Sequence, residues 1–187
     1  MSSVRPSDSP SPGPELARAR GEVLLEALEG RVPSAREHAE ATASYAFAAA
    51  AELGFDREVC LLVREAARLH EVGRLYIDGE SHAATGYRLA LGAGIPEPLC
   101  EWILHCDDRF DAGGRIPIEA RIIAGGVRVR GAARERANVG DATGRWALIS
   151  LTEQAGGRLD PIVIDALARV VERAAERVRG SPARAGG

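Results

Sequence analysis

The sequence has no lysine, few aromatic residues and no long apolar run. Aromatic residues are 4% of its 187 residues, so a core has to be built mainly from Ala, Leu, Val and Ile. Ala and Leu are strong helix formers, and Gly and Pro gather between the apolar runs, which favours helices over strands. Every basic side chain is an arginine.

Cysteine usage, hydropathy and net charge exclude several classes of protein. Cys60, Cys100 and Cys106 are odd in number, form no Cys-x-x-Cys motif and follow no apolar signal stretch. We therefore expect reduced thiols and a cytoplasmic protein. No apolar run approaches the roughly 20 residues of a membrane span, so no membrane association is expected. The net charge of −3 argues against a nucleic acid partner.

The composition divides the chain into two tails and one domain. Residues 1–13 are rich in Ser and Pro, residues 180–187 have similar character, and both are predicted to be disordered. Between them, over residues 14–179, apolar residues recur with helical spacing and no segment alternates as a strand. We predict an all-α domain, a bundle of about eight helices.

Local signals predict the ends of the first two helices. The first runs from about Pro14 to Leu28, with Gly30 beyond its end. The second begins after Ser34, which forms a Ser-x-x-Glu capping box with Glu37. It ends before Gly54, because glycine readily adopts the left-handed conformation that closes a helix.

The third helix is predicted to carry a histidine at its buried end. Asp56 is its N-cap, and its apolar face continues to His70. The remaining helices are expected after Ser81, from Pro96 in a first turn, from Pro117 to about Arg130 with a weak point at Gly125–Gly126, over about residues 145–155, and after the cap Asp160.

The four histidines fall on separate predicted helices, and a carboxylate follows one of them directly. They are His38, His70, His82 and His105, with Glu71 next to His70. Imidazole nitrogen and carboxylate oxygen are ligands for Fe, Mn and Zn. Helical bundles build metal sites from side chains on facing helices, so a divalent metal site is predicted.

The region from about His38 to Val171 resembles an HD domain, and within that superfamily it is most similar to the HD-GYP group. The ordered set of motifs carries the resemblance more than the His-Glu doublet alone. The similar stretches are Arg36–His38, Ala66–Arg74, His82–Gly86, His105–Asp107, Ile116–Ala124 and Gly156–Pro161.

The resemblance implies a metal-dependent phosphohydrolase that acts on a phosphodiester or nucleotide, in most of that group cyclic di-GMP. Its divalent metal, Fe, Mn or Zn, activates a water molecule and neutralises phosphoryl charge. Arg74 would steady the phosphate, and Glu71 would be both a ligand and part of the catalytic machinery. By the resemblance the ligands are His38, His70, Glu71, His82 and His105, with Asp107 as a further candidate.

The chain also departs from the family pattern. Glu71 stands for the usual Asp, which moves the carboxylate oxygens by roughly 1.5 Å. Cys106 replaces a histidine and is interpreted as a packed thiol, Val127 replaces a later ligand Asp, and Arg74 replaces a lysine. The Gly-Tyr-Pro loop is missing, because Asp111–Arg115 leads directly into Ile116–Pro117.

Two functions therefore stay open. The first is a divergent HD phosphohydrolase with a phosphoester or nucleotide substrate. The second is a degenerate, inactive HD module that acts in signalling by binding a nucleotide or a protein partner, or as a homodimer. The intact histidine set favours the first, whereas Glu71, Val127 and the missing loop favour the second.

Overall fold

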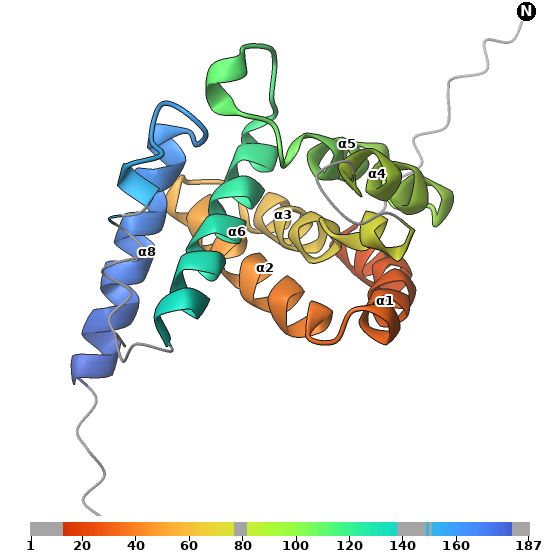
Figure 1. Ribbon diagram of the computed structural model, residues 1–187, viewed down its shortest axis with the longest axis horizontal. Helices are drawn as coiled ribbons and strands as arrows, with labels where there is room; N and C mark the ends of the chain where they lie inside the picture. Colours follow the sequence, from red (N-terminus) through yellow and green to blue (C-terminus); the bar gives the residue numbers. More distant parts are fainter. Residues whose placement is uncertain (1–12, 77–81, 138–148, 150, 181–187) are drawn as a thin grey trace, which may run out of the picture.

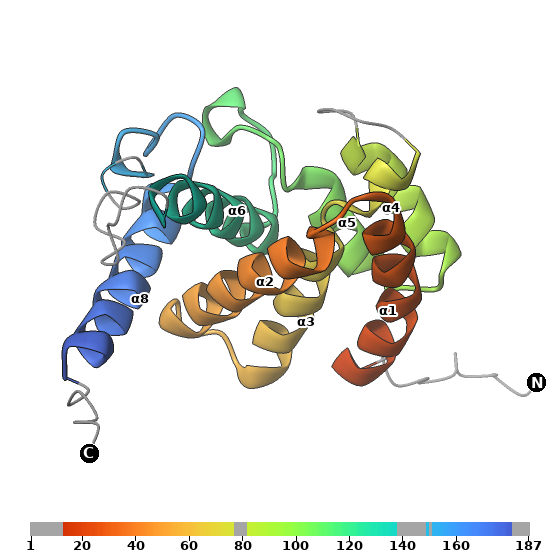
Figure 2. The same ribbon diagram turned by 60° about the horizontal axis from the view of Figure 1, so that its bottom comes forward.

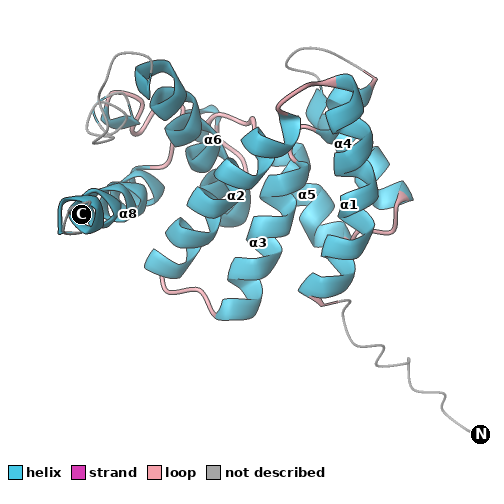
Figure 3. Ribbon diagram, turned by 90° about the horizontal axis from the view of Figure 1, so that it is seen from below, coloured by secondary structure: helices cyan, strands magenta, loops and turns pink. Residues whose placement is uncertain are grey.

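A computed structural model describes residues 13–76, 82–137, 149 and 151–180, and this part of the chain is all-α, as predicted (Figures 1 and 3). The seven α-helices in these ranges are α1 (Pro14–Arg31), α2 (Ala35–Glu52), α3 (Arg57–Leu69), α4 (His82–Gly92), α5 (Glu97–His105), α6 (Ile118–Ala137) and α8 (Pro161–Gly180). Two 3-10 helices, η1 (Val72–Leu75) and η2 (Phe110–Ala112), follow α3 and α5.

Helix α2 lies at the centre of the bundle. It packs against α3 and α1 on one side and against α6 and α8 on the other, and the α4–α5 pair adjoins α3 beside η1 (Figures 1 and 2). The buried residues of these helices form one core cluster of mostly small and aliphatic side chains, as the composition predicted. Small side chains let the helices approach closely.

The reversal between α2 and α3 is fixed by local capping. Gly54 has φ +86°, and the Phe55 N–H donates to the Ala50 carbonyl at 3.1 Å, which is the closing pattern of a Schellman motif. Asp56 then accepts a hydrogen bond from the Val59 N–H at 2.8 Å. Both predicted caps are confirmed. The start of α2 and the end of α3 therefore lie side by side.

The glycine pair in α6 does not weaken that helix. A Cβ at Gly125 would lie 2.7 Å from Leu167 Cδ1, and a Cβ at Gly126 would lie 3.1 Å from the Thr42 carbonyl oxygen. The absence of side chains at these positions allows α6 to pack closely against α8 and α2, and α6 continues to Ala137, beyond the predicted Arg130.

One predicted helix boundary and one predicted cap near the N-terminus were wrong. Helix α1 includes Gly30 and continues to Arg31, whose Nε donates to the Arg74 carbonyl at 3.0 Å. Ser34 does precede α2, but its side chain forms no capping bond, so the predicted box with Glu37 does not form. The backbone of Ser34 is left-handed, with φ 70°, whereas a capping serine needs an extended backbone.

Later boundaries were mostly correct. Pro96 precedes α5 as its N-cap instead of lying in the first turn, and Asp160 caps α8 through the Ile162 N–H at 2.9 Å. Residues 145–148 and 150 of the helix predicted over about 145–155, together with Ser81 and the tails other than Gly13 and Gly180, lie outside the described residues. Among the described helices, none combines the length and apolar composition needed to cross a membrane.

Candidate metal centre

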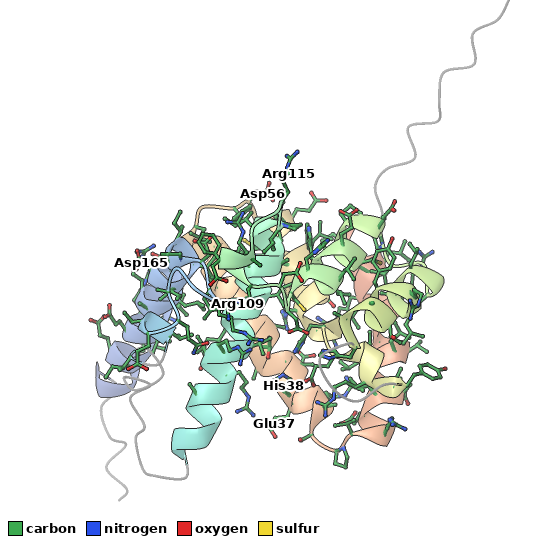
Figure 4. The ribbon with its side chains drawn as sticks, turned by 45° about the horizontal axis from the view of Figure 1, so that its top comes forward. Glu37, His38, Asp56, Arg109, Arg115 and Asp165 are labelled. Carbon is green, nitrogen blue, oxygen red and sulfur yellow. The ribbon has the colours of Figure 1, made fainter. Side chains whose placement is uncertain are left out.

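The α2–α3 reversal brings two of the predicted histidines together. His38 lies in the first turns of α2 (Figure 4). His70 follows α3 directly as its C-cap. Their Nε2 atoms are 3.3 Å apart. His70 is buried, as its place on the apolar face of α3 predicted, whereas His38 is partly exposed. The pair therefore joins a buried position to the surface.

Glu71 completes a three-residue cluster with the two histidines. Its Oε2 is 4.0 Å from His38 Nε2, and one ligand atom from each of His38, His70 and Glu71 lies within 4.8 Å of the other two. Because Glu71 follows the end of α3, its side chain turns to the same place as that of His70. His38, His70 and Glu71 are three of the metal ligands predicted from the sequence.

The hydrogen bonds of His70 determine which ring nitrogen is available to a ligand. Its Nδ1 is 2.8 Å from the Ala67 carbonyl oxygen, and a carbonyl can only accept, so Nδ1 carries the proton. Burial lowers the pKa of His70, although the charge of Glu71 acts in the opposite direction. The ring is therefore neutral, with an unprotonated Nε2 directed toward His38.

Arg74 forms an ion pair with Glu71. Its Nη1 donates to Glu71 Oε1 at 3.0 Å. Burial raises the pKa of Glu71, but the neighbouring His70, His38 and Arg74 outweigh it and hold that pKa below its usual value. The carboxylate is therefore ionised, and the predicted phosphate anchor lies at the edge of the cluster.

The other predicted ligands form two separate pairs. His82 Nε2 lies 3.6 Å from Asp107 Oδ2, and His105 Nδ1 lies 2.7 Å from Asp108 Oδ2 in a more exposed position. Asp107 Oδ2 is buried and has no hydrogen-bond partner among the described residues. The structure thus groups His82 with Asp107 next to the first cluster and places His105 with Asp108.

Gly73 sets the position of His82 relative to the His70–Glu71 segment. A Cβ at Gly73 would lie 1.9 Å from the His82 carbonyl oxygen and 2.7 Å from the Gly86 nitrogen. Only glycine allows η1 to approach the first turn of α4 so closely. The charge of Asp107 also raises the pKa of His70, so the His82–Asp107 pair lies within electrostatic range of the first cluster.

Two positions where the family resemblance expects ligands carry a buried thiol and an apolar side chain. The Cys106 thiol is buried and donates to the Ile103 carbonyl at 3.2 Å, and burial raises its pKa well above the usual value. It remains a thiol, as the sequence reading expected. Val127 is partly buried and packs against the core.

The first cluster fits a divalent transition metal. It offers an unprotonated imidazole nitrogen, a second imidazole and an ionised carboxylate, which is a ligand set suited to Fe, Mn or Zn. In the neutral state described above, His70 Nε2 accepts a hydrogen bond from His38 Nε2, and a bound cation would take the place of the shared hydrogen. Asp107 Oδ2, which pairs with His82 at 3.6 Å but forms no hydrogen bond within the described part of the chain, gives a further acceptor.

Sequence reasoning missed the charged cluster behind the histidine pair. Arg68 is 1% exposed and bonds three glutamates, including Glu40 and Glu65. Glu65 and Arg68 stand three residues apart on α3, the spacing at which helical side chains meet. That spacing was the available signal, although it does not reveal burial.

Comparisons with known proteins agree with the fold and the motifs. Residues 36–124 match the family model described as the HD domain. The crystal structure of the HD domain of the L. monocytogenes phosphodiesterase PgpH aligns with a TM-score of 0.61 and 17% identity, covering 83% of this chain and 98% of that one. The same domain in complex with cyclic-di-AMP gives 0.59 and 15%, covering 87% and 99%. No curated protein matches.

The matched segment contains the histidine pair, Glu71 and the His82–Asp107 pair. Residues 36–124 of this chain are therefore similar in sequence to HD domains. The solved structures extend the similarity to most of the chain at the level of the fold. The HD-GYP subtype is not confirmed by these matches.

Proposed function

We propose that this protein is a metal-dependent phosphohydrolase that cleaves a phosphodiester or nucleotide. The observation that carries the proposal is the cluster of His38, His70 and Glu71, whose ligand atoms lie within 4.8 Å of one another in a segment matched to the HD family. Arg74 supplies a cation at the edge of that cluster. A metal and an adjacent cation are what phosphoryl transfer needs.

Each side chain has a distinct role in the proposed site. His38 and His70 would hold the metal through Nε2, and the Ala67 carbonyl fixes the ring of His70 in the required tautomer. Glu71 would be the anionic ligand, while His82 and Asp107 would hold a further ion. When bound, a divalent metal activates water and neutralises developing phosphoryl charge.

Arg74 would bind a phosphate oxygen of the substrate. The guanidinium offers several donors, and only Nη1 is bonded to Glu71, so the remaining donors can bind the phosphate without breaking that contact. The same residue thus orients Glu71 and contacts the substrate. Arginine forms two parallel hydrogen bonds with phosphate more readily than lysine does.

Cyclic dinucleotides are a reasonable first group of substrates. The PgpH HD domain has been crystallised in complex with cyclic-di-AMP, and its fold is similar to that of this chain. The Gly-Tyr-Pro loop is absent here, so we propose no preference for cyclic di-GMP. The proposal is therefore limited to the class of phosphodiesters and nucleotides.

An inactive HD module that binds a nucleotide or a protein is the second candidate. It is favoured by Cys106 and Val127, which place a protonated thiol and an apolar side chain where the family resemblance expects two ligands. With fewer ligands the site would bind metal more weakly. Metal content separates the two candidates.

The decisive experiment measures metal in the purified full chain, prepared without chelator and without air, and then hydrolysis of bis(p-nitrophenyl) phosphate, cyclic di-AMP and cyclic di-GMP. We expect at least one equivalent of Fe, Mn or Zn per chain. Glu71→Gln and His70→Ala should lose the metal and the activity, because each removes a ligand of the cluster.

Glu52→Gln is the matched control, because Glu52 is a carboxylate at the opposite end of α2. It should retain the metal. A wild-type chain that binds no Fe, Mn or Zn after reconstitution would refute the hydrolase proposal and favour the binding module. Metal loss in Glu52→Gln would show that the assay reports folding rather than ligation.

A further inference from the structure

A buried arginine two residues before His70 ties three helices together. Arg68 donates through Nη2 to Glu22 of α1 at 2.7 Å, through Nε to Glu40 of α2 at 2.7 Å and through Nη1 to Glu65 of α3 at 2.8 Å. Its side chain is 1% exposed. Because all three nitrogens are bonded, the guanidinium has one orientation.

The charges around Arg68 make its burial tolerable. Burial disfavours the charged form, but the bonds to Glu22 and Glu65 outweigh it and raise the pKa of Arg68. Arg36 shares Glu22, and Arg64 lies 3.5 Å from Glu40. A buried charge needs this kind of compensation. The carboxylates of Glu22, Glu40 and Glu65 therefore compensate the buried positive charge of Arg68.

The Arg68–Glu40 contact and the histidine contact lie at the same end of the α2–α3 pair. Glu40 is two residues after His38, and Arg68 is two residues before His70. Residues two apart on a helix point about 200° apart, so the two contacts flank the interface from opposite sides. Ala39 of α2 and Ala66 of α3 are small and buried.

We propose that the Arg68–Glu40 pair is a positioning clamp that holds His38 and His70 at ligand spacing. Contacts between small side chains alone leave the two helices free to pivot about their line of contact. A charged bond on one side opposes a pivot that would separate the histidines on the other. This inference rests on the proposed metal-binding function of the histidine pair.

The test uses Glu40→Gln in the full chain. This change removes one negative charge with almost no change of shape, and Arg68 keeps Glu22 and Glu65, so the chain should fold. Competition with a chromophoric chelator for Zn²⁺ or Mn²⁺ should show binding about tenfold weaker, the effect typical of residues that orient metal ligands. In metal-free protein, amide hydrogen exchange should be faster over residues 36–41 and 68–72.

Two variants make the result specific. Arg68→Lys keeps a positive charge but cannot donate to three separated carboxylates, so it should weaken Zn²⁺ binding as Glu40→Gln does. Glu52→Gln removes a carboxylate of α2 that pairs with Arg169 and Arg173 at the far end of the helix. It should leave both Zn²⁺ affinity and exchange at 36–41 unchanged.

The possible results separate this inference from the proposed function. Unchanged Zn²⁺ affinity and unchanged exchange in Glu40→Gln would overturn the clamp, even if the melting temperature falls, because a merely structural bond would lower stability alone. A wild-type chain without metal would overturn the proposed function. The clamp would then be tested by amide hydrogen exchange over residues 36–41 and 68–72 in Glu40→Gln, because that measurement needs no metal.

Discussion

Replacing Gly73 by alanine should displace the first turn of α4 and destabilise the protein. The new Cβ would lie 1.9 Å from the His82 carbonyl oxygen, 2.8 Å from the His82 carbonyl carbon and 2.7 Å from the Gly86 nitrogen. Real Cβ contacts essentially never fall below 3.0 Å, so η1 and α4 must separate by at least 3.0 − 1.9 = 1.1 Å. All three obstructing atoms belong to the backbone.

The expected magnitude follows from the nature of those obstructing atoms. Overpacking costs about 1–3 kcal/mol, and a backbone obstacle places Gly73→Ala near about 3 kcal/mol because no side chain can rotate away. For a protein of this size, the melting temperature should fall by about 6–12 °C. The shift also moves His82 relative to Asp107.

Thermal unfolding of Gly73→Ala and Gly131→Ala, followed by circular dichroism, tests this reasoning. Gly131 lies inside α6, and a Cβ there meets nothing within 4 Å. The same change should therefore stabilise the protein by about 0.5–1 kcal/mol through helix propensity. If Gly73→Ala melts at or above the wild-type temperature, the close packing of η1 on α4 is refuted.

Two further predictions concern pH and helix capping. Burial lowers the pKa of His70 from 6.5 to about 4, so between these values the unfolded chain binds more protons, and the free energy of unfolding of metal-free protein should decrease as the pH falls through this window. In urea titrations, His70→Asn should make the free energy of unfolding depend less on pH in this window. An unchanged dependence on pH would contradict the assignment to His70. Asp160→Ala removes the cap of α8 and the partner of Arg121 Nη1 at 2.6 Å, and should cost about 2–3 kcal/mol. Asp56→Ala loses only an exposed cap and about 1 kcal/mol, so an equal loss in both variants would count against the role of Arg121.

Sequence reasoning succeeded where the deciding interaction lies within a few residues. Gly54, Asp56 and Asp160 end or begin helices through bonds to their own neighbours. His70 was placed on the buried side because it continues the apolar spacing of α3, and the structure confirms this. Such signals depend on local geometry, which the order of residues fixes.

The errors arose where distant parts of the chain meet. Helix α1 continues past Gly30, and Arg31 is anchored to the Arg74 carbonyl, 43 residues away. The glycine pair of α6 reads locally as a weak point, yet it is where α6 packs closely against α8 and α2. Ser34 has a suitable side chain for a cap but a left-handed backbone, which residue type alone does not predict.

The sequence by itself determined the all-α class, the resemblance to HD domains and the set of candidate ligands, because helical periodicity and motif order are properties of the chain. Only the tertiary structure decided that His38 meets His70 and Glu71, that His82 pairs with Asp107, and that Arg68 is buried among carboxylates from three helices. These contacts depend on how helices cross and how close their backbones come, and that follows from packing over the whole core.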